Sequence, residues 1–509
     1  MFGGGEFEIS RRGLLIITAP PEYNPAMIGS QGLWYLKLET FTESSPKLQR
    51  IRNSDKEYKG PVVSASFSFD GRYAAYVQQK GERGAVREND IFVIDLESDD
   101  FKSHQVSTTS QGVDIEPVSV IFSNDGKEIY VEAEYRAHTV LFKQTYDLTK
   151  HKLGGELALI PLEGSISAVH RLSSASNTKN HLFITTSSFI DPSIYMIIDP
   201  TLDSPPTIIS DQMQAGSLIS LHRSQVSEIN ITRTSKSGSS YSVQSFITVP
   251  SNFSKSKKYP LCMLIHGGPQ VVLQEAWSTR WNPAVFAEQG YIVVNPNPTG
   301  SNSFGFQYTN AINGEWGGDC YRDIEATFEH IERTMPWVDT SRAVLGGGSF
   351  GGYMTNWIAG QPLGAKMKAL FSHDGVFSLV NMVASDVPAE FDIEVGAKLW
   401  EDPEKFHQYA PSSFTKNWKT PMLVIHSDND YRCPITEGLA AHNVCQMKGI
   451  ESRFLNFPDE NHFVLKQENS LQWYRSVLGW INKYADVQGG VQWKPALTRG
   501  PWRKPKGDV

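Results

Sequence analysis

Five glycines surround a single serine in the stretch GGGSFGGYM, residues 346–354. Glycine loses more conformational freedom on folding than any other residue, so this cluster predicts a backbone geometry that larger side chains would not tolerate. Gly347-Gly348-Ser349-Phe350-Gly351 fits the pattern G-x-S-x-G, a sharp strand-to-helix turn that presents a nucleophilic serine above a parallel sheet. A phosphate-binding loop is the alternative, but such a loop places a lysine after its glycines, where this chain has Phe350 and Tyr353. We therefore predict that Ser349 is a nucleophile.

A serine hydroxyl needs a neighbouring base, and the base needs an acid to orient it. On this kind of turn the three residues follow in the order Ser, Asp, His. The stretch MLVIHSDNDYRCP supplies Asp428 and Asp430 at the end of a later strand, and FLNFPDENHFV supplies His462 after the next strand. A solvated loop histidine is the alternative for His462, but its order and strand-end position favour the base. His426 lies within a strand and is interpreted as structural, whereas His373 ends a strand that comes too early in the order.

The negative oxygen that forms during acyl transfer needs two fixed donors. One is predicted to be the backbone N–H of Phe350, which follows the nucleophile. The second is predicted to be the Gly268 amide in the loop His266-Gly267-Gly268-Pro269, although Gly-Gly-Pro also occurs in ordinary turns. Three residues shortly after this loop are candidates for lining a substrate cleft, with core packing as the alternative for the two tryptophans: Trp277, Arg280 and Trp281.

The elements around these residues alternate between strands and helices. Nearly continuous apolar runs are typical of parallel strands buried on both faces, and they occur at 259–268, 290–297, 342–348, 368–375 and 422–428. Helical apolar stripes occur at 321–335, with Ile324, Phe328, Ile331 and Met335, and at 470–485, with Leu471, Tyr474, Val477, Leu478 and Ile481. This alternation predicts an α/β-hydrolase domain over 216–487. A flexible tail is predicted over 488–509, which is rich in Pro, Lys, Arg and Trp.

The first half of the chain contains short strands instead. ASFSFDGRYAAYV (65–77) and VIFSNDGKEIYVEA (120–133) repeat one phrase, and each contains an Asp-Gly pair that is a strong hairpin signal. The step from Phe67 to Phe122 is 122 − 67 = 55 residues, a period that favours propeller blades over a β-sandwich. Since 1–215 has room for about four blades, we predict an open or truncated β-propeller there.

Composition limits the function classes. The net charge of −8 and pI near 5.9 argue against nucleic-acid binding. The four cysteines are too few and too scattered for a disulfide framework or a zinc site, although two of them could pair. No apolar run is long enough to cross a membrane, and LLIITA (14–19) is interpreted as a strand rather than a secretion signal.

These residues together resemble the prolyl oligopeptidase family of serine peptidases. HGGPQ, GGSFGGYM, LVIHSDNDYRCP and FPDENH stand in the order of that family, and longer stretches such as STRWNPAVFAEQGY are similar to its fungal dipeptidyl-peptidase branch. The resemblance covers 225–485 densely and 12–215 loosely. It implies that Ser349 is the nucleophile, His462 the base and Asp430, rather than Asp428, the acid. No metal or organic cofactor is implied.

The resemblance also implies release of dipeptides from the free N-termini of short peptides, as well as secretion and a propeller of about seven blades. Against that expectation the sequence has room for about three blades fewer and shows no signal peptide, so two alternatives stay open: a fragment of a longer chain, or a short form with an open ring. An anion for the substrate's amino group would come from outside the hydrolase domain. Glu134, or Glu88 and Asp90, are the candidates, with a solvated surface charge as the alternative for each. The competing functions are an acylaminoacyl-peptidase or esterase on the same triad, and a non-catalytic protein.

Overall fold

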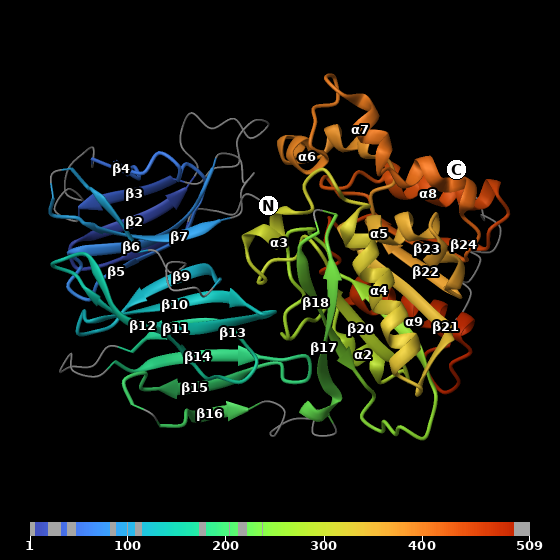
Figure 1. Cartoon of the computed structure of the whole chain (residues 1–509), viewed down its shortest axis with the longest axis horizontal. Helices are drawn as coiled ribbons and strands as arrows, with labels where there is room; N and C mark the ends of the chain where they lie inside the picture. Colours follow the sequence, from blue (N-terminus) through green and yellow to red (C-terminus); the bar gives the residue numbers. More distant parts are fainter. Residues whose placement is uncertain are drawn as a thin grey trace, which may run out of the picture.

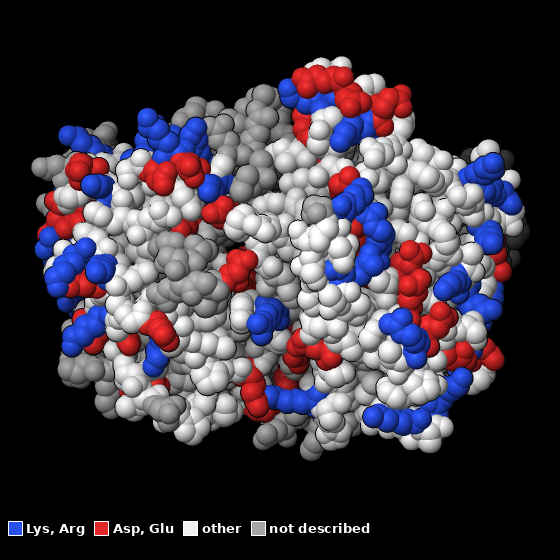
Figure 2. Space-filling view, in the orientation of Figure 1, with Lys and Arg blue, Asp and Glu red and all other residues white. Residues whose placement is uncertain are grey.

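The structure, a computed structural model, describes residues 6–18, 32–37, 47–81, 88–98, 100–106, 114–172, 180–202, 204–211, 221–236 and 238–492. Two parts lie side by side, a stack of small antiparallel sheets and a larger α/β domain (Figure 1). None of the described helices is long and apolar enough to span a membrane. On the face drawn in Figure 2, positive and negative side chains are interspersed over both parts rather than gathered by sign.

Each of the four small sheets in the described chain contains four strands that are consecutive in sequence. The first contains β1 (Glu6–Ile9), β2 (Gly13–Thr18), β3 (Gly32–Lys37) and β4 (Gln49–Ile51). The second contains β5 (Val62–Phe67), β6 (Tyr73–Gln79), β7 (Asn89–Asp95) and β8 (Ser103–Val106). The third contains β9 (Glu116–Phe122), β10 (Glu128–Tyr135), β11 (His138–Asp147) and β12 (Lys152–Ile160). The fourth contains β13 (Ser165–Arg171), β14 (Leu182–Ser187), β15 (Ile194–Ile198) and β16 (Thr207–Asp211).

These sheets are the propeller blades that the repeated phrase predicted. In the second blade, the Ser68 hydroxyl donates to the Asp70 carboxylate at 2.6 Å, and Gly71 takes a φ of 71° to close the β5–β6 hairpin. In the third blade, Ser123 donates to Asp125 at 2.7 Å, and the next residue is again a glycine of positive φ. The same local chemistry therefore closes the same hairpin in both repeats.

The α/β domain is built on one eight-stranded sheet of order β17-β18-β20-β19-β21-β22-β23-β24. The two strands β17 (Val226–Thr234) and β18 (Ser240–Thr248) form an antiparallel edge. The others are parallel: β19 (Tyr259–Ile265), β20 (Ile292–Asn297), β21 (Val338–Gly348), β22 (Ala369–His373), β23 (Met422–Ser427) and β24 (Ser452–Phe457). This is the α/β-hydrolase arrangement that the alternation predicted.

Helices cover both faces of this sheet. One apolar cluster joins a face of the sheet to α4 (Asp319–Thr334), α5 (Phe350–Ala359) and α8 (Thr436–Met447), and the other joins the opposite face to α2 (Pro283–Ala287) and α9 (Gln467–Ala485). Three shorter helices complete the described domain: α3 (Phe306–Asn310), α6 (Pro388–Val395) and α7 (Pro403–Gln408). Burial on both faces explains why the parallel strands are apolar throughout.

The structure decides two expectations from the sequence, the buried stripe of the last helix and the pairing of the cysteines. The predicted apolar stripe of the last helix is wrong at its start, because Leu471 is 51% exposed, whereas Val477, Leu478 and Ile481 are buried. In this turn the buried face is occupied by Trp473 instead, which is 3% exposed and whose ring centre lies 6.4 Å from that of Phe371 in β22. The four cysteines, Cys262, Cys320, Cys433 and Cys445, are all free and buried, so no pair among them is bridged.

The hairpin between β10 and β11 docks onto the α/β domain. The Ala137 N–H donates to the Ser303 hydroxyl at 2.8 Å, and the Ser303 N–H donates to the half-buried Glu116 carboxylate at 2.8 Å. His138 also lies 3.2 Å from the Glu275 carboxylate, in the loop after β19. These contacts hold the loops after β19 and β20 against the propeller.

The predicted domain boundary between 215 and 216 falls in a stretch, 212–220, that lies outside the described residues. The last blade strand ends at Asp211, and the first strand of the large sheet begins at Val226. Of the predicted tail, residues 493–509 also lie outside the described residues.

Candidate active site

Ser349 is the single residue between β21, which ends at Gly348, and α5, which begins at Phe350. Its φ of 58° lies in the left-handed region, which costs a non-glycine residue about 1–3 kcal/mol. Added Cβ atoms at Gly347 and Gly351 would lie 2.4 and 2.1 Å from the Ile265 carbonyl oxygen, closer than packing allows. The glycines on either side of the serine are therefore required by the close approach of β19.

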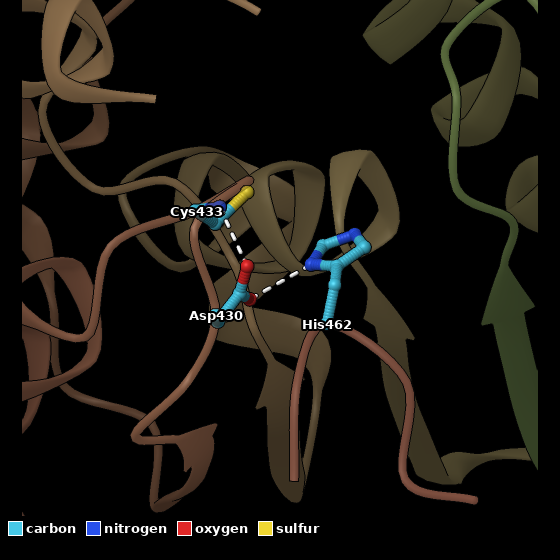
Figure 3. A group of neighbouring side chains, drawn as sticks. All are labelled: Asp430, Cys433 and His462. Carbon is cyan, nitrogen blue, oxygen red and sulfur yellow. Dashed lines mark hydrogen bonds and ion pairs between the residues drawn. The ribbon is translucent and has the colours of Figure 1, made fainter. Parts of the chain in front are cut away.

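The predicted acid and base are hydrogen-bonded to each other. Figure 3 shows His462 Nδ1 against the Asp430 carboxylate, at 2.7 Å from Oδ2. The other oxygen, Oδ1, accepts the backbone N–H groups of Arg432 at 2.9 Å and Cys433 at 2.8 Å. Asp430 is 2% exposed, whereas Asp428 points into solvent. The chain path after β23 thus brings the second aspartate of the motif, not the first, to the histidine.

Ser349 and His462 line the same cavity, whose volume is about 400 Å³. Of the predicted cleft residues, Arg280 and Trp281 also line it, as does Gly268. The Trp277 N–H instead donates to Ser187 Oγ of the fourth blade at 3.2 Å, and Trp277 is absent from the described lining. The structure thus gathers most of the candidates around one opening.

Of the two predicted oxyanion donors, Gly268 lines this cavity, and Phe350 directly follows Ser349 in the chain. Phe350 begins α5, so its N–H is one of the first four helix amides, which have no acceptor within the helix. Gly268 is held by its neighbour His266, whose ring nitrogens lie 2.6 Å from the Gly267 carbonyl oxygen and 3.0 Å from Ser301 Oγ. Burial lowers the pKa of His266 to about 4, so its ring is neutral near pH 7. The loop is therefore fixed by neutral contacts.

A second, smaller cavity of about 50 Å³ opens beside Ser349. Gly268 and Arg432 line both cavities, but His462 and Arg280 do not line the smaller one. Five apolar residues line it, Trp316, Phe350, Val376, Val387 and Phe391, together with Cys433 and the charged residues Glu394 and Arg432. Such a shape suits one small apolar side chain.

Two residues that sequence reasoning set aside or missed also line the larger cavity, His373 and Asp374. Burial lowers the pKa of His373 to about 4. Burial, together with Asp430, raises the pKa of Asp374 to about 7, against the opposing effect of His426 and His462. The available signal was their place at the end of β22, because the carboxyl ends of parallel strands meet at one edge of the sheet.

The acidic candidates for the substrate's amino group are elsewhere. Glu134 accepts from Gln274 Nε2 at 3.1 Å, Glu88 lies 3.4 Å from Lys80, and Asp90 accepts from Gln105 at 2.7 Å. None of the three is among the described residues that line the larger cavity.

Potential metal ligands also coincide with the site. Asp430, Cys433 and His462 offer ligand atoms within 4.8 Å of one another (Figure 3), as do Asp374, His426 and Asp430. Both Asp430 oxygens already accept hydrogen bonds, and burial raises the pKa of the Cys433 thiol well above its ordinary value. A thiol that stays protonated is a poor ligand, so we assign no metal here.

Residues 277–488 match the sequence profile of the prolyl oligopeptidase family. Over 493 residues, the chain is 34% identical to the dipeptidyl-peptidase 5 of Trichophyton schoenleinii, an alignment that covers 96% of this chain and 65% of that protein. The chain is thus similar to the prolyl oligopeptidase family, by the family profile over 277–488 and by this relative over most of its length. Another relative, the dipeptidyl-peptidase 5 of Aspergillus fumigatus, is 38% identical over 441 residues, which are 85% of this chain and 58% of the relative. The chain thus spans about two thirds or less of the length of these relatives.

Solved structures agree with the predicted fold of this chain. An acylaminoacyl peptidase from Pyrococcus horikoshii superposes with a TM-score of 0.75 at 18% identity, covering 96% of this chain and 71% of that one. At this identity the similarity concerns the fold, and it confirms the predicted combination of propeller blades and α/β-hydrolase domain.

Proposed function

We propose that this chain is a serine peptidase that cleaves short peptides and releases dipeptides from their N-termini. The observation that carries the proposal is the 2.7 Å hydrogen bond between Asp430 and His462, with His462 and Ser349 lining one cavity. The names of the relatives, dipeptidyl-peptidase 5, supply the dipeptide specificity.

The proposed reaction gives each of these residues one role. His462 takes the proton of the Ser349 hydroxyl as its oxygen attacks the scissile carbonyl, and Asp430 holds Nδ1–H so that Nε2 can accept. The amides of Phe350 and Gly268 donate to the oxyanion. His462 then gives its proton to the leaving amine, and water cleaves the acyl-enzyme by the same steps in reverse.

The second candidate is release of N-acylated residues, and one observation favours it. The carboxyl group among the described residues lining the larger cavity belongs to Asp374, which is 1% exposed and whose pKa burial raises to about 7. Among its described lining residues the larger cavity therefore offers a substrate ammonium only this buried carboxyl, whereas Glu394 lines the smaller cavity. A blocked N-terminus would need no carboxylate partner.

The first experiment is labelling of the purified chain with a fluorophosphonate probe, beside Ser349→Ala. We expect the wild type to be labelled and the variant to remain unlabelled. Equal labelling of both would place the reactive serine elsewhere, and a folded wild type that is not labelled would refute the proposal. Chromogenic dipeptides with free and blocked N-termini, together with a simple ester, then separate the two candidate specificities.

A further inference from the structure

Arg280 presents a cation to the larger cavity. Its guanidinium carbon lies 4.6 Å from the ring centre of Phe463, the residue that directly follows His462. Arg280, Phe463 and His462 all line the cavity that Ser349 lines. The arginine therefore stands on the histidine side of the candidate nucleophile.

No described carboxylate forms an ion pair with Arg280. The other arginine that lines this cavity, Arg432, lies 2.6 Å from the Asp386 carboxylate. The lining carboxyl of Asp374 accepts from the Ser427 N–H at 3.1 Å instead. Burial lowers the pKa of Arg280, which reflects the cost of keeping this charge out of water. An anion entering the cavity would offset that cost.

The backbone around Arg280 is fixed before any ligand arrives. Its carbonyl accepts the Tyr474 hydroxyl of α9 at 2.9 Å, and its N–H donates to Ser278 Oγ at 3.2 Å. The next residue, Trp281, packs edge-on against Trp473 with ring centres 4.7 Å apart. A cation held in this way loses little freedom when it binds an anion, which favours affinity.

The two cavities beside Ser349 differ in the part of a substrate that each can hold. The smaller one lacks His462 and is lined by five apolar residues, which suits the side chain that precedes the scissile bond. The base returns its proton to the leaving amine, so the leaving group must lie on the His462 side. Arg280 packs on Phe463 at that side. The cation therefore faces the leaving group rather than the acyl group.

We propose that Arg280 binds the C-terminal carboxylate of the leaving product, so that the enzyme favours substrates ending within about two residues of the cleaved bond, the reach of a short extended segment. A guanidinium matches a carboxylate with two parallel N–H···O bonds. This inference rests on the proposed peptidase function and adds a substrate class to it: short peptides with a free C-terminus.

The test compares tripeptides that differ at one group, a free C-terminal acid against the C-terminal amide. For each enzyme, kcat/KM is measured on both by quantifying the released dipeptide, and the readout is the acid-to-amide ratio. We expect a wild-type ratio on the order of ten or more, since hydrogen bonds between charged groups are the strong ones. Arg280→Gln should bring the ratio near one, and Arg280→Lys should keep part of it.

Arg342→Gln is the matched control, because Arg342 pairs with Asp339 and does not line the described cavity. It should keep the wild-type ratio, which separates a local contact from the loss of one positive charge. If Arg280→Gln lowered kcat/KM equally for the acid and the amide, so that their ratio stayed at the wild-type value, the inference would be overturned and Arg280 would have a packing role. A wild-type ratio near one would also overturn it, while leaving the peptidase proposal intact.

A binding measurement keeps the two proposals separable. The same tripeptide acid and amide are titrated into folded Ser349→Ala, which cannot turn them over. Tighter binding of the acid, lost when Arg280→Gln is added, would support the inference even if the wild type cleaved neither peptide. Equal binding of acid and amide would overturn it.

Discussion

Replacing Asp430 by asparagine tests the proposed mechanism at its most constrained atom. The aspartate uses one oxygen for two backbone N–H groups and the other for His462 Nδ1, at 2.7 Å. Asparagine keeps the shape but has a single acceptor oxygen. If that oxygen stays with the two N–H groups, the new NH₂ faces Nδ1 and donates to it. The imidazole proton then moves to Nε2, which can no longer accept the proton of Ser349.

The opposite rotamer is worse for folding, because it sets the NH₂ against two N–H donors in a buried site. We therefore expect the wrong histidine tautomer to dominate and kcat/KM to fall by about 10⁴-fold. That loss corresponds to about 5.5 kcal/mol of activation free energy. The assay is hydrolysis of a chromogenic dipeptide, with thermal unfolding to show that the variant is folded.

Asp428→Asn is the matched control, since Asp428 lies two residues away and is exposed. It should keep kcat/KM within about twofold, as surface substitutions usually do. A value for Asp430→Asn within tenfold of wild type would refute the assignment of the acid. An equal loss in Asp428→Asn would show that the two aspartates act through a property other than the contact with His462.

Three other outcomes follow from the same geometry. Gly351→Ala places a Cβ 2.1 Å from the Ile265 carbonyl oxygen, so we expect loss of fluorophosphonate labelling and a markedly lower melting temperature. Labelling and a melting temperature equal to those of the wild type would contradict the close approach of the two segments. Burial raises the pKa of Asp374 above its ordinary value of 3.8, so its contribution to stability is full below pH 4 and is lost as pH rises through the raised pKa. Urea unfolding of Asp374→Asn should therefore show a weaker pH dependence above pH 4 than the wild type, and an unchanged slope would argue against a titrating Asp374 beside His426, Asp430 and His462. Val376→Trp should fill the 50 Å³ cavity, and kcat/KM should fall by about tenfold or more for substrates with a large side chain before the scissile bond but little for those with glycine there. Equal losses of kcat/KM for both substrates would show that this cavity does not bind that side chain.

Local patterns determined much of this protein from its sequence. The Ser-x-Asp-Gly phrase closes a hairpin by contacts within four residues, so its two copies predicted two blades. The buried strand before Ser349 and the helix after it are likewise local, and they determined the turn that holds the serine.

What remained open depended on contacts between distant segments. Asp428 and Asp430 are equivalent by position in the sequence, and the hydrogen bond to His462, thirty-two residues later, distinguishes them. Likewise, the place of Asp374 beside the candidate triad follows from the parallel register of β22 against β23, which no short stretch encodes.

Arg280 shows the same limit most clearly. The sequence marked it as a cleft candidate because it follows the Gly-Gly-Pro loop, but it could not give its side of the nucleophile. That side is decided by packing against Phe463 and by the hydroxyl of Tyr474, both near or within the C-terminal helix. Periodicity and turn chemistry act over a few residues, whereas the meeting of strand ends and loops is a property of the whole packed sheet.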